Sequence, residues 1–264
     1  MKEFILFKNP EEFQTRPEVI RCATISGEER FHFHEVREEN AHHVIELHAG
    51  PYSVLEAVIL QNLPISGKVS IKVNVHLEND ARLKVTVVQN GGEASQVEIQ
   101  SGGLGKGSRL EIRGLQNAKG IQKFSFRAKV NHTVPHAQSD LQVWCAARDD
   151  SRSVFNGDVS IGKGAHHTEA FQKNKNLMLS RRAVVDSFPK LFIENHNVKC
   201  AHGSSTSTLE PDQAYYLQAR GINGSEAEEM LIHGFIRQAI AGVGNKECRD
   251  HLHASLGVQD EEWA

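Results

Sequence analysis

The sequence lacks any apolar run that approaches the roughly 20 residues needed to cross a bilayer. The first residues, Met1 to Lys8, are apolar at only a few positions and show no small-residue cleavage site, so a secretory signal is not expected. Neither sign of charge is in marked excess, because 30 Lys and Arg stand against 33 Asp and Glu. Nucleic-acid-binding proteins usually carry a clear basic excess. We therefore expect a cytoplasmic protein that binds neither a membrane nor nucleic acid.

Cysteine is scarce and scattered. The four cysteines, Cys22, Cys145, Cys200 and Cys248, form no C-x-x-C pair. This spacing fits neither a disulfide framework nor a zinc ribbon, so reduced thiols are expected. Histidine, in contrast, is abundant, with 15 in the chain. Because imidazole is the commonest metal ligand in proteins, each histidine cluster is a candidate site.

From about residue 19 to 208 the sequence predicts one β-strand after another. The segment 69–77 alternates apolar and polar residues with a period of two, as a strand with one buried face does. The same alternation returns at 83–87, 97–99, 110–112, 124–130 and 141–143, and shorter segments of this kind precede it at 19–20, 31–33, 44–47 and 54–60. The segments recur at roughly 12 to 16 residues, which is typical of a sandwich, a barrel or a solenoid.

The connections between these segments narrow the choice of fold. None is long enough for a crossover helix, which excludes a βαβ architecture. Asn90-Gly91-Gly92 is compatible with a hairpin turn and favours locally antiparallel strands. Most other connections lack such two-residue turn signals, as expected of a parallel β-helix. The pattern alone leaves these options open.

The pattern changes to helices at Leu209. Pro211 and Gly221 suit the start and the end of a first helix. Ser225 and Glu228 form a capping box for a second helix, 225–240, whose apolar residues form one broad stripe. A weaker third helix is predicted over 246–256. We therefore divide the chain into an N-terminal segment (1–18), a β body (19–208) and a helical region (209–264), which by default folds back as a cap and otherwise offers a docking surface.

One histidine cluster suggests a metal site. The segment 27–38, GEERFHFHEVRE, resembles the first motif of the cupin family. His32 and His34 would point the same way from one strand, and Glu38 would complete a set of metal ligands. Its glycine is one residue too close, and no second motif with its own histidine follows. The alternatives are an exposed strand face and a cupin-like metal-binding enzyme that uses His32, His34 and Glu38.

Two other patterns give weaker evidence for a functional site. Gly157 to Lys163 fits G-x-x-x-x-G-K, but Gly164 stands where a P-loop needs Ser or Thr, so no nucleotide site is expected. The remaining histidine pairs have spacings that do not bring two rings together on one metal ion. These pairs lie at 42/43, 132/136, 166/167 and 251/253. We expect these histidines to be structural or solvent-facing.

Cys200-Ala201-His202 differs from these pairs. Two residues apart on a strand, the thiol and the imidazole face the same side. Thiolate and imidazole together suit iron or zinc. The alternatives are a cysteine packed as a small hydrophobic side chain and a Cys–His nucleophile, for which the sequence offers no orienting carboxylate.

The stretch from His132 to about Phe235 resembles the core of the SufB/SufD family, the scaffold components of an iron–sulfur cluster assembly system. The segments that carry this resemblance are HTVPHAQS (132–139), SVFNG (153–157), QKNKNL (172–177), DSFPKL (186–191), VKCAHG (198–203) and YYLQARGI (215–222). Within the family, VKCAHG resembles the SufD branch, because SufB proteins tend to carry His-Glu-Ala where this chain has His202-Gly203-Ser204. Because the chain is short, it resembles a minimal SufD-like member. The first 130 residues match only as generic β-helix turns.

The resemblance implies a mainly β fold, a right-handed parallel β-helix with a short C-terminal α-helical subdomain. It implies a non-catalytic scaffold subunit that docks a SufC-like ABC ATPase and pairs with a SufB-like paralogue or with a second copy of itself. It also makes the helical region, about 211–240, a docking surface rather than a cap. The candidate docking residues are Tyr215, Tyr216, Arg220, Met230, Leu231 and Phe235.

The resemblance also carries site residues. His202 matches a family histidine implicated in cluster assembly at the interface between subunits, and Cys200 matches a family cysteine of less certain role. It implies no tightly bound cofactor in the isolated chain and a transient iron–sulfur cluster in the complex.

Overall fold

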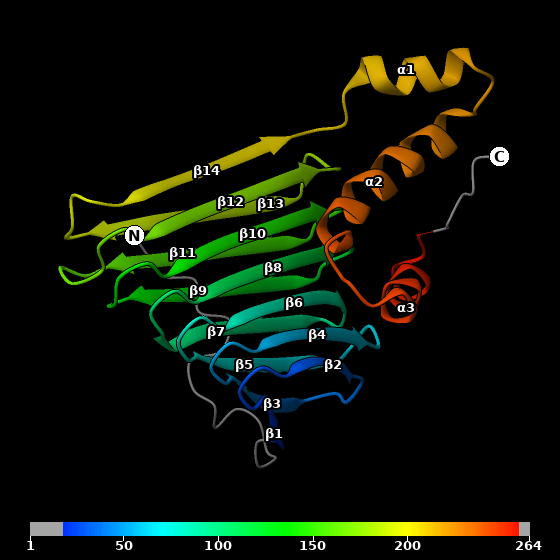
Figure 1. Cartoon of the computed structure of the whole chain (residues 1–264). Helices are drawn as coiled ribbons and strands as arrows, with labels where there is room; N and C mark the ends of the chain where they lie inside the picture. The colour runs from blue at the N-terminus through cyan, green and yellow to red at the C-terminus, as the bar shows by residue number, and fades with distance from the viewer. Residues whose placement is uncertain (1–17, 259–264) are drawn as a thin grey trace.

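The computed structural model describes residues 18–258. Its strands alternate between two seven-stranded sheets, with odd-numbered strands in one sheet and even-numbered strands in the other (Figure 1). Within the sheets every pair of neighbouring strands is parallel. Each odd strand and the even strand after it form one coil, so the chain winds through seven coils of a β-solenoid. The predicted parallel β-helix is thereby confirmed.

The elements have the following bounds. The strands are β1 (Glu18–Ala23), β2 (Glu29–Val36), β3 (Ala41–Ala49), β4 (Val54–Leu63), β5 (Lys68–Leu77), β6 (Arg82–Gly91), β7 (Ala94–Leu104), β8 (Arg109–Ala118), β9 (Lys123–His132), β10 (Gln138–Ala147), β11 (Arg152–Ile161), β12 (Glu169–Met178), β13 (Val184–Ile193) and β14 (Lys199–Ser207). The helices are α1 (Pro211–Ala219), α2 (Gly224–Ile240) and α3 (Lys246–Leu256).

The period-two alternation builds the interior of the solenoid. In β5, Val69, Ile71 and Val73 are fully buried, while the residues between them are partly exposed. Residues that pair in register across successive strands of one sheet point the same way and form what we call an interior column. One such column joins Ala57, Val85, Ile112 and Leu141, all of them buried. Stacked aliphatic columns of this kind fill the space between the two sheets.

The expected hairpin at Asn90-Gly91-Gly92 is wrong. Strands β6 and β7 lie in different sheets, and Gly91 and Gly92 turn the chain from one sheet to the other with φ angles of 75° and 81°. A Cβ atom on Gly91 would clash with the Leu63 carbonyl oxygen, and one on Gly92 would come within 2.8 Å of the Gly67 carbonyl oxygen. The glycines are therefore needed for close approach of stacked coils, and not for strand reversal.

The turns on the opposite edge stack as well, and they explain one histidine pair. His136 and His167 occupy equivalent turn positions in successive coils, both with positive φ. Each backbone N–H donates to a carbonyl of the next coil, His136 to His166 at 2.9 Å and His167 to Asn197 at 2.7 Å. The two imidazole rings stack with centroids 4.9 Å apart as a result. This pair is a product of coil stacking.

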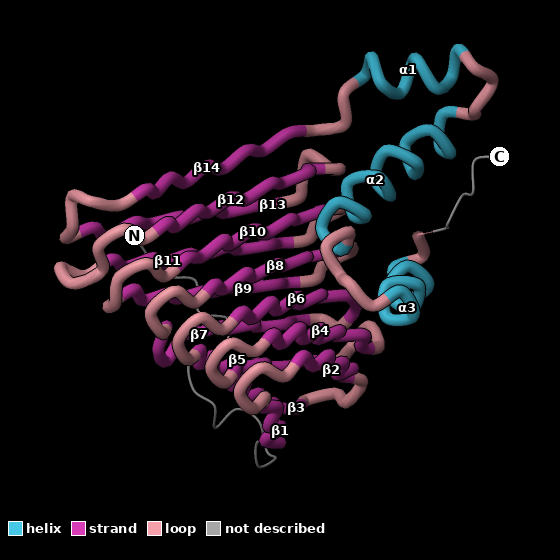
Figure 2. The backbone as a smooth tube through the Cα atoms, in the orientation of Figure 1, coloured by secondary structure: helices cyan, strands magenta, loops and turns pink. Residues whose placement is uncertain are grey.

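Helices α2 and α3 fold back over the outer face of the even-numbered sheet (Figure 2). One outward-facing row of this sheet is apolar and buried, running through Leu60, Val88, Leu115 and Trp144. Ile236 and Ile240 of α2 and Leu252 of α3 belong to the same hydrophobic cluster. This part of the helical region is a cap on its own β body.

The ends of the helices differ in one respect from expectation. The N-cap of α2 is Asn223, whose side chain accepts a hydrogen bond from the Glu226 N–H at 2.9 Å, so the predicted Ser225–Glu228 capping box is wrong. Ser225 donates to the Asn223 side chain instead. Gly257 closes α3 in the left-handed conformation. None of the three helices that the structure describes has the length and apolar character required to cross a membrane.

Candidate functional site

Cys200 and His202 lie on β14, the last strand of the even-numbered sheet. They pair in register with Ala170 and Gln172 of β12, both of which are buried. Paired residues of a parallel sheet point the same way, so Cys200 and His202 face the interior side of the solenoid, as their spacing predicted. Among the described coils none lies beyond β13 and β14, so His202 is exposed and Cys200 half-buried there.

The interior becomes polar towards this end. The aliphatic column of Ala57, Val85, Ile112 and Leu141 ends in Gln172 and His202. The next column likewise changes from apolar residues to Asn174 and Ser204. An open end lined by amide, hydroxyl, thiol and imidazole groups is better suited to bind a polar ligand or a metal ion than a packed apolar core is.

Hydrogen bonds hold the side chains of Gln172 and Asn174, which together we call the polar floor of this end. Gln172 Nε2 donates to the Gly157 carbonyl at 3.3 Å, and Asn174 Nδ2 donates to the Val143 carbonyl at 3.1 Å. Gln172 Oε1 is buried and has no hydrogen-bond partner within the described chain. Ser204 Oγ donates to Ser187 Oγ at 3.0 Å and so connects β14 with β13 across the solenoid.

Sequence reasoning placed these polar residues in a family segment without giving them a role. The signal was present, because Gln172 and Asn174 alternate at the positions where the paired strand β10 carries Leu141 and Val143. Both are buried. In these two columns the change from aliphatic to polar residues marks the coil before the open end.

Cys200 differs from the other three cysteines. Those are buried, and burial raises the pKa of the Cys145 thiol to about 12 and that of Cys248 to about 11. A thiol with so high a pKa is a poor metal ligand and a poor nucleophile at neutral pH. All four are free thiols, as expected. Cys200 is only partly packed against the core, so it is the cysteine that a ligand at this end could reach.

The candidate docking residues fall into two groups. Tyr215 and Tyr216 on α1 are 73% and 56% exposed, and the Arg220 guanidinium lies 4.6 Å from the centre of the Tyr216 ring. Met230, Leu231 and Phe235 of α2 line a groove of about 340 Å³ beside the connection from β14 to α1. Phe235 also packs against the hydrophobic cluster under α2. Helix α1 buries no residue of its own.

The predicted cupin-like set is wrong in fold and in composition. His32 and His34 lie on β2, which pairs in parallel with β4 in the solenoid, whereas a cupin is a double-sheet jelly roll of antiparallel strands. The exposed Glu38 follows β2, but the ligand atoms near it belong to Glu18 and His43, and these three lie within 4.8 Å of one another. This group lies at the opposite end of the solenoid from His202.

His132 is a histidine with a structural role. It is buried, and its Nε2 lies 2.8 Å from Ser139 Oγ. Burial lowers the pKa of His132 to about 4, so the imidazole is neutral at physiological pH. It contributes to folding and faces no open site.

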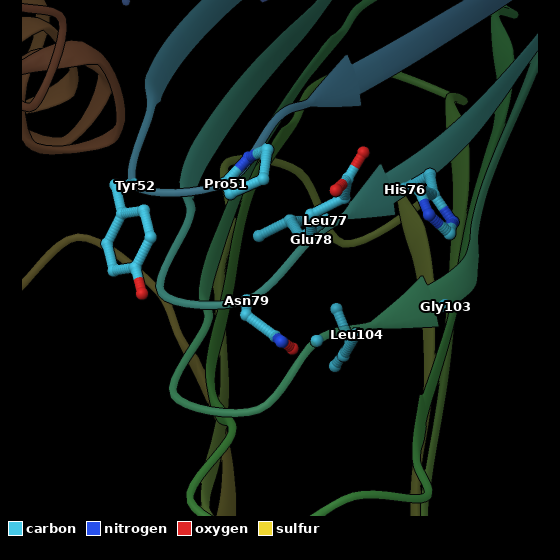
Figure 3. Close-up of a pocket in the computed structure, with 9 residues that line it drawn as sticks. Pro51, Tyr52, His76, Leu77, Glu78, Asn79, Gly103 and Leu104 are labelled. Carbon is cyan, nitrogen blue, oxygen red and sulfur yellow. The ribbon is translucent and has the colours of Figure 1, made fainter. Parts of the chain in front are cut away.

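One further pocket, of about 340 Å³, lies where the turns after β3, β5 and β7 stack (Figure 3). Figure 3 shows His76, Glu78 and Tyr52 among the residues that line it. Glu78 is paired with His48 at 2.8 Å, and His48 contacts the His76 ring. No residue predicted to form a site lies here.

Comparison with known proteins shows which proteins this chain is similar to. The family model for the SufBD core domain of the SUF iron–sulfur cluster assembly system matches residues 22–235. An iron–sulfur cluster assembly SufBD family protein of Mycobacterium leprae is 32% identical over 188 residues, 68% of this chain. The iron–sulfur cluster assembly proteins SufD of Escherichia coli and Bacillus subtilis are 28% and 31% identical over 58% and 52% of this chain. The matched regions cover 48%, 36% and 31% of these relatives, so the chain spans about half of their length or less.

Proposed function

Since the chain belongs to the SufB/SufD family of iron–sulfur cluster assembly proteins, we propose that it is a non-catalytic scaffold subunit of a Suf-type assembly complex. The observation that carries this proposal is the open end of the solenoid, where Cys200 and His202 face the interior side beside a buried polar floor. The nascent iron–sulfur cluster is the cargo of this end, and His202 and Cys200 offer it nitrogen and sulfur ligands.

The end strands supply the assembly interface. Strands β13 and β14 each pair on one side only within the described chain, which leaves a row of backbone donors and acceptors on the other side. A partner that adds its own end strands would continue both sheets. That partner is a SufB-like paralogue or a second copy of this chain. Joining two ends would enclose the cargo and supply the ligands that this chain lacks.

A SufC-like ABC ATPase docks on the helical region. Helix α1 stands away from the β body, buries none of its residues and presents Tyr215 and Tyr216 to solvent. Exposed aromatic residues are enriched at protein–protein interfaces. The groove lined by Met230, Leu231 and Phe235 continues this surface towards α2.

Co-purification with the SufC-like ATPase of the same source tests this docking. Deleting the helical region would be a poor test, because α2 and α3 cover the apolar row that includes Leu115 and Trp144. We propose instead the double substitution Tyr215→Ser and Tyr216→Ser, with Gln218→Ala on the same helix as the matched control. The double variant should lose the ATPase and the control should retain it.

Two outcomes contradict the proposal in different ways. Retention of the ATPase by the double variant would remove α1 from the interface and leave the scaffold role standing. Failure of the unaltered chain to bind the ATPase, with or without a SufB-like partner present, would overturn the scaffold role itself.

A further inference from the structure

A second cluster of ligand-type side chains lies at the other end of the solenoid. Glu18 on β1, Glu38 in the turn between β2 and β3, and His43 on β3 place one ligand atom each within 4.8 Å of one another. His43 Nδ1 lies 3.1 Å from Glu18 Oε2. The residues come from β1, from the turn after β2 and from β3, so the fold and not a single loop brings them together.

The burial of His43 is the feature that points to a ligand. Its side chain is only 2% exposed, and neither of its ring nitrogens has a hydrogen-bond partner within residues 18–258, Nδ1 included, which faces the Glu18 carboxylate. His43 pairs with Ile71, and the same interior column continues through Val97 and Phe126. A nitrogen left unpaired where other coils carry apolar residues costs free energy unless something binds it.

His34 adds a fourth group. Its ring lies 5.6 Å from the His43 ring, centroid to centroid, and its Nε2 is likewise buried without a partner in the described chain. Burial lowers the pKa of both His34 and His43. His34 also experiences the charges of Glu18 and Glu38.

We propose that Glu18, Glu38 and His43, with His34 beside them, bind one divalent transition-metal ion of the zinc class. Imidazole and carboxylate ligands together suit such an ion, and two carboxylates balance its charge. Bound there, the ion joins β1, the turn after β2 and β3, and so fastens the first coil. The site is distinct from the open end that carries His202, and the isolated chain then holds a metal, contrary to the expectation from sequence.

Zinc titration of the full-length chain tests the site. The chain is prepared without a polyhistidine tag, stripped of metal with a chelator and titrated with Zn²⁺ by calorimetry. We expect one ion per chain and a higher melting temperature with zinc, because an ion that binds only the folded state stabilises it. Mg²⁺ at the same concentration should neither bind nor compete.

Variants locate the bound ion. Glu18 and Glu38 are exposed, so Glu18→Gln and Glu38→Gln should fold, and each should weaken zinc binding at least about tenfold. Glu39→Gln, one residue along the same turn, is the matched control and should bind as the unaltered chain does. Zinc binding that survives Glu38→Gln, or that is lost instead in His136→Gln at the stacked surface pair, would overturn the proposal. Because no ATPase or partner enters this titration, its result does not depend on the scaffold role.

Discussion

His202 of β14 lies directly beside Gln172 of the neighbouring parallel strand β12. Gln172 belongs to the last coil with a packed interior, and His202 belongs to the coil after it. Gln172 is buried and held by the Gly157 carbonyl, whereas His202 is exposed at the end of the same interior column. The imidazole is therefore presented by a strand of the sheet with a fixed floor behind it. Groups placed on regular elements keep their positions better than groups on loops, which suits a residue that meets a cluster at an interface.

Replacing His202 with alanine should separate assembly from folding. His202 is exposed, so His202→Ala should change the free energy of unfolding by no more than about 0.5 kcal/mol. ATPase binding should also persist, because the docking residues Tyr215 and Tyr216 lie on α1 and not on β14. Iron–sulfur cluster assembly, measured by complementation of a strain that lacks the chain, should fail or fall sharply.

Ser205→Ala is the matched control for His202→Ala. Ser205 is an exposed residue of the same strand, but its position in the alternation places it on the outer face. It should support assembly fully. Normal complementation by His202→Ala would remove this histidine from the site and leave Cys200 as the remaining candidate ligand.

The floor beneath His202 depends on Gly157. A Cβ atom there would clash with Gln172 Nε2 and come within 2.7 Å of Phe155 Cζ. Gly157→Ala should therefore lower the free energy of unfolding by about 1–3 kcal/mol, as overpacking of a core does. Urea denaturation measures this change. Gly203→Ala is the control, because a Cβ on Gly203 meets nothing within 4 Å, and equal stabilities of the two variants would contradict the packing described here.

The attachment of α2 is tested at Ile236. This residue is fully buried against the even-numbered sheet, so Ile236→Ala should cost about 2–5 kcal/mol of stability. In a Trp263→Phe background Trp144 is the only tryptophan, and its emission should shift to the red if α2 leaves the sheet. Glu228→Ala on the exposed face of α2 should leave both readouts unchanged. An unshifted, equally stable Ile236→Ala variant would show that α2 is not the cap.

Much of the β body was predictable because its signal is local. The alternation at Val69, Ile71 and Val73 needs only a sheet with one buried face, and each coil repeats that pattern. Parallel pairing was not visible in the alternation, because it depends on which strand follows which in space. Gly91 and Gly92 show the difference: their positive φ was predictable, but whether it reverses a strand or joins two sheets is set by the coils stacked on either side.

The candidate site was predictable only in part, for a related reason. The shared face of Cys200 and His202 follows from their spacing along one strand. Their position at the open end, above Gln172, depends on how many coils follow. The group of Glu18, Glu38 and His43 was missed because its members come from different elements. His32, which the sequence placed with Glu38, does not belong to that group.

The buried His132 predicts a specific loss of stability in acid. Its pKa is about 4 in the folded chain against a usual value of 6.5, because burial disfavours the charged imidazole. Between these two pH values the unfolded chain binds more protons than the folded chain. The contribution of neutral His132 to the free energy of unfolding is therefore fully present above about pH 6.5, and it falls as the pH drops towards 4. From pH 7.5 to pH 5 this histidine alone should cost about 2 kcal/mol.

Comparison with His132→Gln isolates that contribution. Glutamine can still pair with the Ser139 hydroxyl but does not titrate, while His34 and His43, whose pKa values burial also lowers, remain in both proteins. Whatever the substitution costs at pH 7.5, the free energy of unfolding of the variant should fall by about 2 kcal/mol less than that of the unaltered chain on going to pH 5. Urea denaturation at several pH values gives both slopes. Parallel slopes would mean that the folded chain protonates His132 as readily as the unfolded chain does, and that burial does not lower the pKa of this imidazole.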